Sequence, residues 1–87
     1  MYLPLKIEIF KEGDVYVAVS PQLNVSSFGD TVEDARFSLK EAVAAFIEEC
    51  LDMGTLDEVL EEAGFSRKNG DWEPRSLVLE DRISLSC

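Results

Sequence analysis

The sequence predicts a single small α+β domain over residues 1–87, in which a long helix covers one face of a mainly antiparallel sheet. Three observations predict this class. Apolar residues alternate with polar ones near both ends of the chain, which is the period of a strand with one buried face. A long stretch in the middle has helical spacing. A second, shorter helical stretch follows it. The expected order is therefore β-β-β-α-(short α)-β.

Two paired strands and a weaker third are expected in the N-terminal third. Apolar residues alternate over residues 3–9 and again over residues 15–19, and residues 11–14 supply a turn between the two runs. This pattern predicts a β-hairpin. Pro21 cannot donate to a strand ladder and ends the second strand. The third strand, residues 24–28, contains serines that suggest a face near solvent or at an interface.

The long helix is expected from Val32 to about Met53. Thr31, or Asp30 before it, can cap its first amides, and Gly54 is well placed to end it. Its apolar residues span roughly 220° of the helix circumference, well beyond the usual stripe of a little over 100°. One face should cover the sheet, and the other must meet a second helix or another subunit.

The second apolar face of this helix predicts self-association as a homodimer or homotetramer. Its residues are the candidate oligomer interface: Phe37, Ala44, Ile47 and Leu51. Packing within the chain, beneath the short helix, accounts almost as well for Phe37, Ile47 and Leu51.

The short helix is expected over residues 56–63, with a capping box at residues 55–58 that begins with Thr55, and with Gly64 to end it. It is too short to be stable unless it docks on the rest of the chain. Residues 65–76 are polar and turn-forming, which predicts a loop with Trp72 as its one large anchor. The tail, residues 77–87, alternates again and predicts one long strand or two short ones.

The charge balance excludes several classes of protein. The chain has 18 acidic and 8 basic residues, a net charge of −10, and no histidine. Nucleic-acid readers need clustered lysine and arginine to neutralise phosphates. Without histidine, the commonest acid–base group and the commonest zinc ligand are both missing. An acidic surface fits a basic protein partner, although solvated helix faces explain the acids equally well.

Two cysteines do not make the disulfide framework of a small secreted domain. The N-terminus has no continuous apolar region of a signal peptide. No apolar run approaches the roughly 20 residues that span a bilayer. We therefore expect a reduced, cytoplasmic protein with no membrane association.

Three segments in order carry a family resemblance. Residues 17–25 (VAVSPQLNV) end a strand in Pro-x-Leu, residues 27–35 (SFGDTVEDA) open a helix, and residues 39–43 (LKEAV) continue it. In this order they resemble the HicB-type antitoxin family, closely over residues 15–49. One departure is Phe28, where many relatives carry glutamine. An exposed aromatic there belongs to an interface or packs on Trp72.

The resemblance implies a core similar to a truncated RNase H fold, assembled as dimers or tetramers. Members of the family neutralise HicA, a small basic ribonuclease toxin, and many add a C-terminal DNA-binding segment that represses their operon. After Gly54 this chain offers only a helix, a loop and a strand, with eight acidic residues. No separate C-terminal DNA-binding domain is recognised, and we expect no direct nucleic-acid binding.

We also considered a different class of function, a residual enzyme. An RNase H-type nuclease needs several carboxylates that converge on two divalent metals. The candidates for such a set are Glu8, Glu33 or Glu41, and Glu80 or Asp81. Because Glu8 points away from the expected core and the spacing is not fixed, we expect no enzymatic activity and no cofactor or metal.

The sequence therefore predicts an antitoxin-like protein that binds and neutralises a small basic HicA-type, mRNA-cleaving toxin. Eight acidic residues and no basic residue lie between Glu41 and Ser66, and such a field steers a basic partner. The alternative is a solitary, self-assembling structural or interaction domain with no toxin partner. The candidate partner contacts are Asn24, Ser26, Phe28, Glu58, Glu61 and Glu62.

Overall fold

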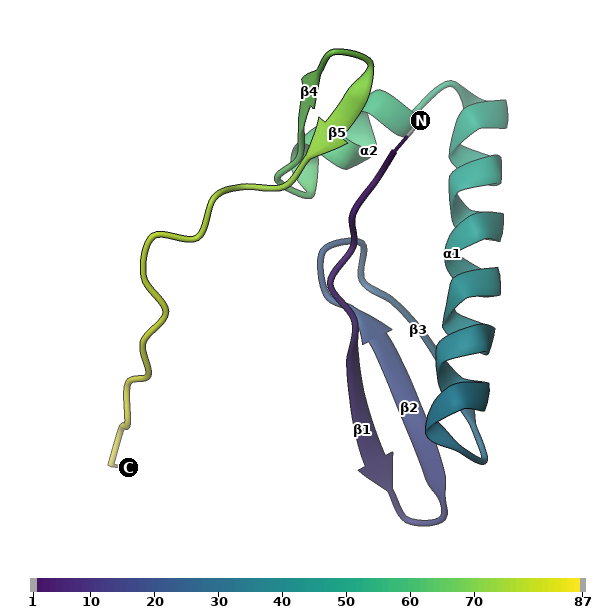
Figure 1. Cartoon of the computed structure of the whole chain (residues 1–87), viewed down its shortest axis with the longest axis vertical. Coiled ribbons are helices and arrows are strands. Elements are labelled where there is room, and N and C mark those ends of the chain that lie inside the picture. Colours follow the sequence, from purple (N-terminus) through teal and green to yellow (C-terminus); the bar gives the residue numbers. More distant parts are fainter. Residues whose placement is uncertain (1, 87) are drawn as a thin grey trace.

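The computed structural model describes residues 2–86 and confirms the α+β class. Figure 1 shows a sheet beside a long helix, a small hairpin near the far end of that helix, and an extended C-terminal tail. The elements, in chain order, are β1 (Glu8–Glu12), β2 (Val15–Ser20), β3 (Val25–Gly29), α1 (Val32–Met53), α2 (Leu56–Glu62), β4 (Ser66–Lys68) and β5 (Asp71–Glu73).

The first three strands form an antiparallel sheet in the order β1-β2-β3. The expected hairpin and third strand are both present, but β1 begins at Glu8 rather than at Leu3. Since Glu8 lies opposite Val19, the same register would place Lys6 opposite Pro21. Proline has no N–H for a ladder, which explains why the strand pairing stops there.

Helix α1 covers one face of the sheet, over β3 and β2 far more than over β1. On β2, Ala18 and Ser20 are fully buried, whereas the valines of residues 15–19 are only partly buried. Side chains alternate between the two faces of a strand, so those valines lie on the uncovered face. The apolar alternation of β2 therefore marks the face away from α1, whereas the helix-facing residues are Tyr16, Ala18 and Ser20.

The ends of α1 agree with the sequence prediction. The Asp34 backbone N–H donates to Thr31 Oγ1 at 3.0 Å, which is an N-cap bond. At the other end Gly54 takes a left-handed conformation, with φ 71°. Gly29 permits the tight turn from β3 into α1, because a Cβ there would lie 2.5 Å from the Ala35 nitrogen.

The larger part of the core lies at the C-terminal end of α1. Helix α2 docks there, as its short length requires, and Leu60 is fully buried. The buried residues of this cluster are Leu23, Cys50, Leu56, Leu60, Phe65 and Trp72. A smaller cluster beneath the first half of α1 contains Ala18, Ala35 and Leu39.

The expected loop over residues 65–76 contains a second hairpin instead. β4 and β5 pair in antiparallel fashion, and Asn69 and Gly70 between them have φ of 54° and 84°. Two positive φ values at an Asn-Gly pair match a two-residue hairpin turn. The sequence did not predict this hairpin, because its strand residues other than Trp72 are exposed and show no apolar alternation.

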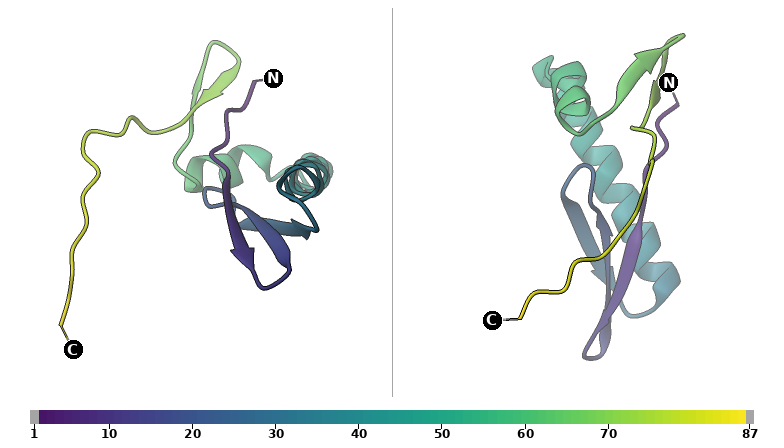
Figure 2. Two further views of the ribbon diagram at one scale, coloured as in Figure 1. Left: turned by 60° about the horizontal axis from the view of Figure 1, so that its bottom comes forward. Right: turned by 90° about the vertical axis from the view of Figure 1, so that its left-hand side faces the viewer.

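The tail forms no strand within residues 74–86 and leaves the body as an extended segment. Its large apolar side chains are 75–96% exposed. The radius of gyration is 15.2 Å, against about 12 Å for a compact chain of this length. The left view in Figure 2 shows the tail clear of the body, and in the right view its end projects beyond the strands. The expected final strand is therefore absent from residues 77–86, and Cys87 lies outside the described residues.

Candidate interaction surfaces

The candidate contacts on β3 lie on the face of the sheet that α1 leaves uncovered. Ser26 and Phe28 are exposed, and Phe28 is 68% exposed. Asn24 is also exposed but has a local structural role, since its φ of 56° belongs to the turn before β3. Phe28 does not pack on Trp72, which belongs to the buried cluster around α2.

An apolar patch surrounds Phe28 on this uncovered face. Phe10 on β1 and Phe28 on β3 both lie opposite Val17 of β2, so the three form a row across the sheet. Directly opposed residues on one face of a sheet are in contact distance. We call this surface the sheet patch; its residues are Phe10, Val15, Val17, Val19 and Phe28.

The acidic candidates on α2 are exposed and belong to a larger acidic surface. Between Glu41 and Ser66 the eight acidic side chains are all exposed. Within residues 2–86 one of them, Asp57, forms an ion pair, with its Oδ2 3.3 Å from Arg67 Nη1. This acidic end consists of Glu41, Glu48, Glu49, Asp52, Asp57, Glu58, Glu61 and Glu62.

The β3 and α2 candidates do not form one compact site. Phe28 lies just before α1 begins, and α2 follows directly after α1 ends. A helix of 22 residues is about 33 Å long. Phe28 and the acidic residues of α2 therefore lie near opposite ends of α1 (Figure 1), whereas Asn24 directly follows Leu23, which is buried in the cluster around α2.

The candidate oligomer residues divide between the surface and the core. Ile47 packs against the cluster around α2. Phe37 and Leu51 are 62% and 59% exposed, and Ala44 between them is exposed too. These three lie seven residues apart, so they share one side of α1. We call them, with the exposed acids Glu41 and Glu48 between them, the outer stripe of α1.

An apolar cavity of about 220 Å³ opens between residues 5–7, the end of β2 and α1. It exists because α1 lies over β3 and β2 and leaves the helix side of β1 poorly covered. Ser20 is fully buried, and its Oγ has no hydrogen-bond partner among the described residues. We call this cavity the edge hollow; it is lined by Leu5, Ile7, Ser20, Arg36, Leu39, Lys40 and Val43.

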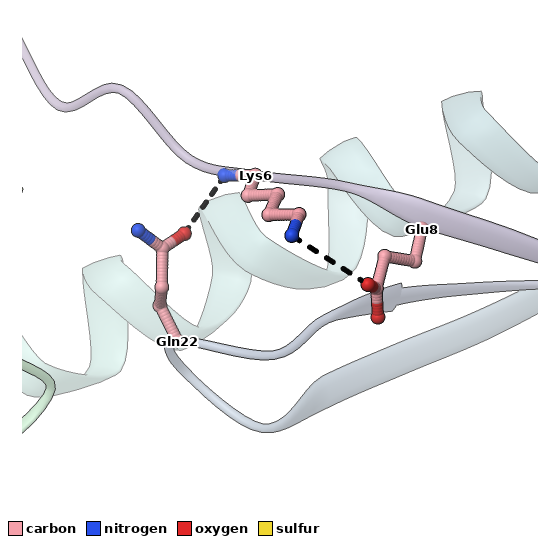
Figure 3. A network of polar contacts seen from close by, with 3 residues as sticks. All are labelled: Lys6, Glu8 and Gln22. Carbon is pink, nitrogen blue, oxygen red and sulfur yellow. Dashed lines mark hydrogen bonds and ion pairs between the residues drawn. The ribbon is translucent and has the colours of Figure 1, made fainter. Parts of the chain in front are cut away.

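The N-terminal segment is tied to the body beside the edge hollow. Figure 3 shows the Lys6 backbone N–H donating to Gln22 Oε1, at 2.7 Å, while Lys6 Nζ lies 3.8 Å from Glu8 Oε2. The Lys6 N–H is thus satisfied by a side-chain acceptor instead of a carbonyl of the strand ladder. Both Lys6 and Glu8 are solvent-accessible, so the ion pair adds little stability.

Within residues 2–86, the structure brings together no group of three or more cysteine, aspartate or glutamate side chains that could hold a metal ion. The carboxylates considered for a nuclease therefore do not converge there. In the same part of the chain, no helix has the length and apolar character needed to cross a membrane.

No family model matches this chain, and comparisons with curated proteins and with solved structures give no match either.

Sequence reasoning assigned no residue of the sheet patch other than Phe28, and no residue of the edge hollow, to a surface site. Three of the missed residues are Phe10, Arg36 and Lys40. Each had a sequence signal. Phe10 is an aromatic residue at a polar position of its strand, and Arg36 and Lys40 are the only basic residues of α1. Their grouping with other residues depends on strand register and on the position of α1 over the sheet.

Proposed function

We propose that this chain is an antitoxin-like, cytoplasmic protein that binds and neutralises a small basic, HicA-type ribonuclease. The observation that carries this proposal is the composition of the outer stripe of α1. It combines exposed apolar side chains with carboxylates, and it continues into the acidic end of the molecule. The resemblance of residues 15–49 to HicB-type antitoxins supports the toxin as the partner.

The charge distribution selects a basic partner for this stripe. Two copies meeting through it would place Glu41 and Glu48 against the same residues of the other copy, and opposed like charges are unfavourable. A basic protein would meet these carboxylates with opposite charge. The electrostatic field of the carboxylates would accelerate association with the basic protein, and contacts at Phe37 and Leu51 would slow dissociation of the complex. We therefore assign the stripe to the toxin rather than to a second copy.

The first test is co-expression with any small basic protein encoded beside this gene. The chain should form a complex with it and restore growth. In binding kinetics, Glu41→Lys with Glu48→Lys should slow association by roughly 10-fold at low salt. Leu51→Ala should mainly speed dissociation. The control, Glu12→Lys with Asp14→Lys, makes the same change in charge on the β1–β2 hairpin and should have a smaller effect.

Two outcomes contradict parts of this proposal. Equal slowing by the stripe and control variants would show that net charge, and not the stripe, governs encounter. The analogous reversal of Glu58, Glu61 and Glu62 then tests α2, and Phe28→Ala tests the sheet patch. If no neighbouring protein binds and growth is not restored, the antitoxin function is wrong.

A second candidate function is a solitary, self-assembling interaction domain. The observation that favours it is the tail, whose apolar side chains from Leu77 to Leu85 are at least 75% exposed. Patches of this kind on a small protein mark interaction sites. Assembly of the pure chain, without any partner protein, would support this candidate.

A further inference from the structure

The tail has the side-chain pattern of a strand with one apolar face. Leu77, Leu79, Ile83 and Leu85 occupy alternate positions, and each is at least 75% exposed. A segment with period-two alternation is suited to a sheet whose one face is buried. The single exception in this apolar set is Asp81.

The tail is also the part of the chain best able to approach another copy. Residues 74–86 carry two basic and two acidic side chains, so the whole net charge of −10 belongs to the remainder. Two such bodies repel each other. A neutral, apolar segment adds nothing to that repulsion.

The edge hollow provides an apolar surface and, beside it, an open strand edge for this segment. Its lining is almost entirely apolar, and β1 next to it has a strand partner on only one side, since the sheet order is β1-β2-β3. Arg36 and Lys40 line the same hollow and supply positive charge for Asp81.

We propose that residues 77–86 of one copy add as a strand to the β1 edge of a second copy. Leu77, Leu79, Ile83 and Leu85 then cover the edge hollow, and Asp81 meets Arg36 and Lys40. Because each chain carries both the tail and the hollow, two copies exchange tails about a twofold axis. This inference rests on self-assembly, the second candidate function, and not on a basic partner.

The base of the tail favours exchange over folding back. Pro74 fixes its own φ near −65°. The Arg75 side chain packs on Gly64, where a Cβ would lie 2.6 Å from Arg75 Nε. Residues 77–79 still border a cavity with Lys6 and Gln22, and beyond them the tail extends away from its own body (Figure 1). Its apolar face is thus presented to another molecule.

The first test measures the mass of the full-length chain by sedimentation velocity. The wild type should be a dimer, and Leu79→Glu and Ile83→Glu should each be monomers with unchanged circular dichroism. Ser84→Glu places the same charge at the opposite parity and should remain a dimer. A monomeric wild type would overturn both self-assembly and tail exchange. Dimers in the Leu79 and Ile83 variants would overturn tail exchange and leave self-assembly standing.

The second test decides whether the contact is between chains. Asp81→Lys, and separately Arg36→Glu with Lys40→Glu, should each weaken the dimer at least 10-fold. An equimolar mixture should regain the dimer, because each tail then meets a hollow of opposite charge. Without recovery in the mixture, a contact between Asp81 and the hollow of another chain is wrong.

Discussion

Two threonines at helix starts show that the contribution of a side chain to stability depends on its hydrogen-bond geometry. Thr31 and Thr55 both precede a helix and both looked like caps in the sequence. In the structure, Thr31 Oγ1 accepts the Asp34 N–H at 3.0 Å. Thr55 makes no such bond; its Oγ1 instead donates to the Cys50 carbonyl across 3.5 Å. The two residues therefore have different energetic roles.

This difference gives a prediction for stability. Thr31→Ala should lower the free energy of unfolding by about 1 kcal/mol, the usual effect of losing a side-chain N-cap. Thr55→Ala should lower it by clearly less, because its long hydrogen bond caps no amide of α2. Urea denaturation of the two variants at equal protein concentration makes the comparison. A larger loss for Thr55→Ala would contradict the capping geometry.

At the scale of elements, the limits of α1 could be predicted because its start and end signals are local. Thr31 and Gly54 act within one turn of the helix, so the sequence alone suffices. The β4–β5 hairpin also has a local signal, Asn69-Gly70, but its strands lack apolar alternation. Only Trp72 is buried there. Its burial depends on α2, which lies outside the hairpin, so the residues around Trp72 do not reveal it.

The burial of Trp72 gives a prediction for the stability contributed by the β4–β5 hairpin. Its side chain is 2% exposed within the cluster around α2, and its backbone N–H donates to the Tyr2 carbonyl at 3.1 Å. Trp72→Ala should lower the free energy of unfolding by about 3–5 kcal/mol, as measured by circular dichroism in urea.

Two further variants separate packing from polar effects. Trp72→Phe should be milder than Trp72→Ala, since the indole Nε1 has no partner among the described residues and its removal breaks no hydrogen bond. Arg67→Ala removes an exposed cation 5.4 Å from the centre of the Trp72 ring, a contact worth about 0.5–1 kcal/mol. It also removes the exposed ion pair with Asp57, which adds little stability. Equal losses for Trp72→Ala and Arg67→Ala would show that the hairpin does not complete the core.

At the scale of the whole molecule, charge and apolar surface are distributed unevenly. The acidic end carries eight acidic side chains, whereas the edge hollow carries two of the chain's basic residues, Arg36 and Lys40. The sequence indicated the acidic run directly, because it is contiguous. It did not indicate the sheet patch or the edge hollow, because both combine residues that are distant in the chain.

The tail shows the opposite relation between sequence and structure. Its alternation was recognisable in residues 77–87, and a strand was expected, yet the isolated chain forms none within residues 77–86. Apolar alternation indicates which face a strand would bury, but it does not indicate which molecule covers that face. The same sequence signal is thus compatible with pairing inside one chain or between two, and the sheet of this chain leaves the β1 edge open.

Amide hydrogen exchange of residues 77–86 in the full-length protein tests most directly the claim that other chains complete this domain. Backbone amides paired with β1 of a second copy exchange slowly, and free ones exchange fast. We predict slow exchange at concentrations where the dimer predominates and fast exchange after dilution or in Leu79→Glu. Fast exchange of the tail in the wild type at every concentration, or slow exchange that persists in a monomer, would contradict the account.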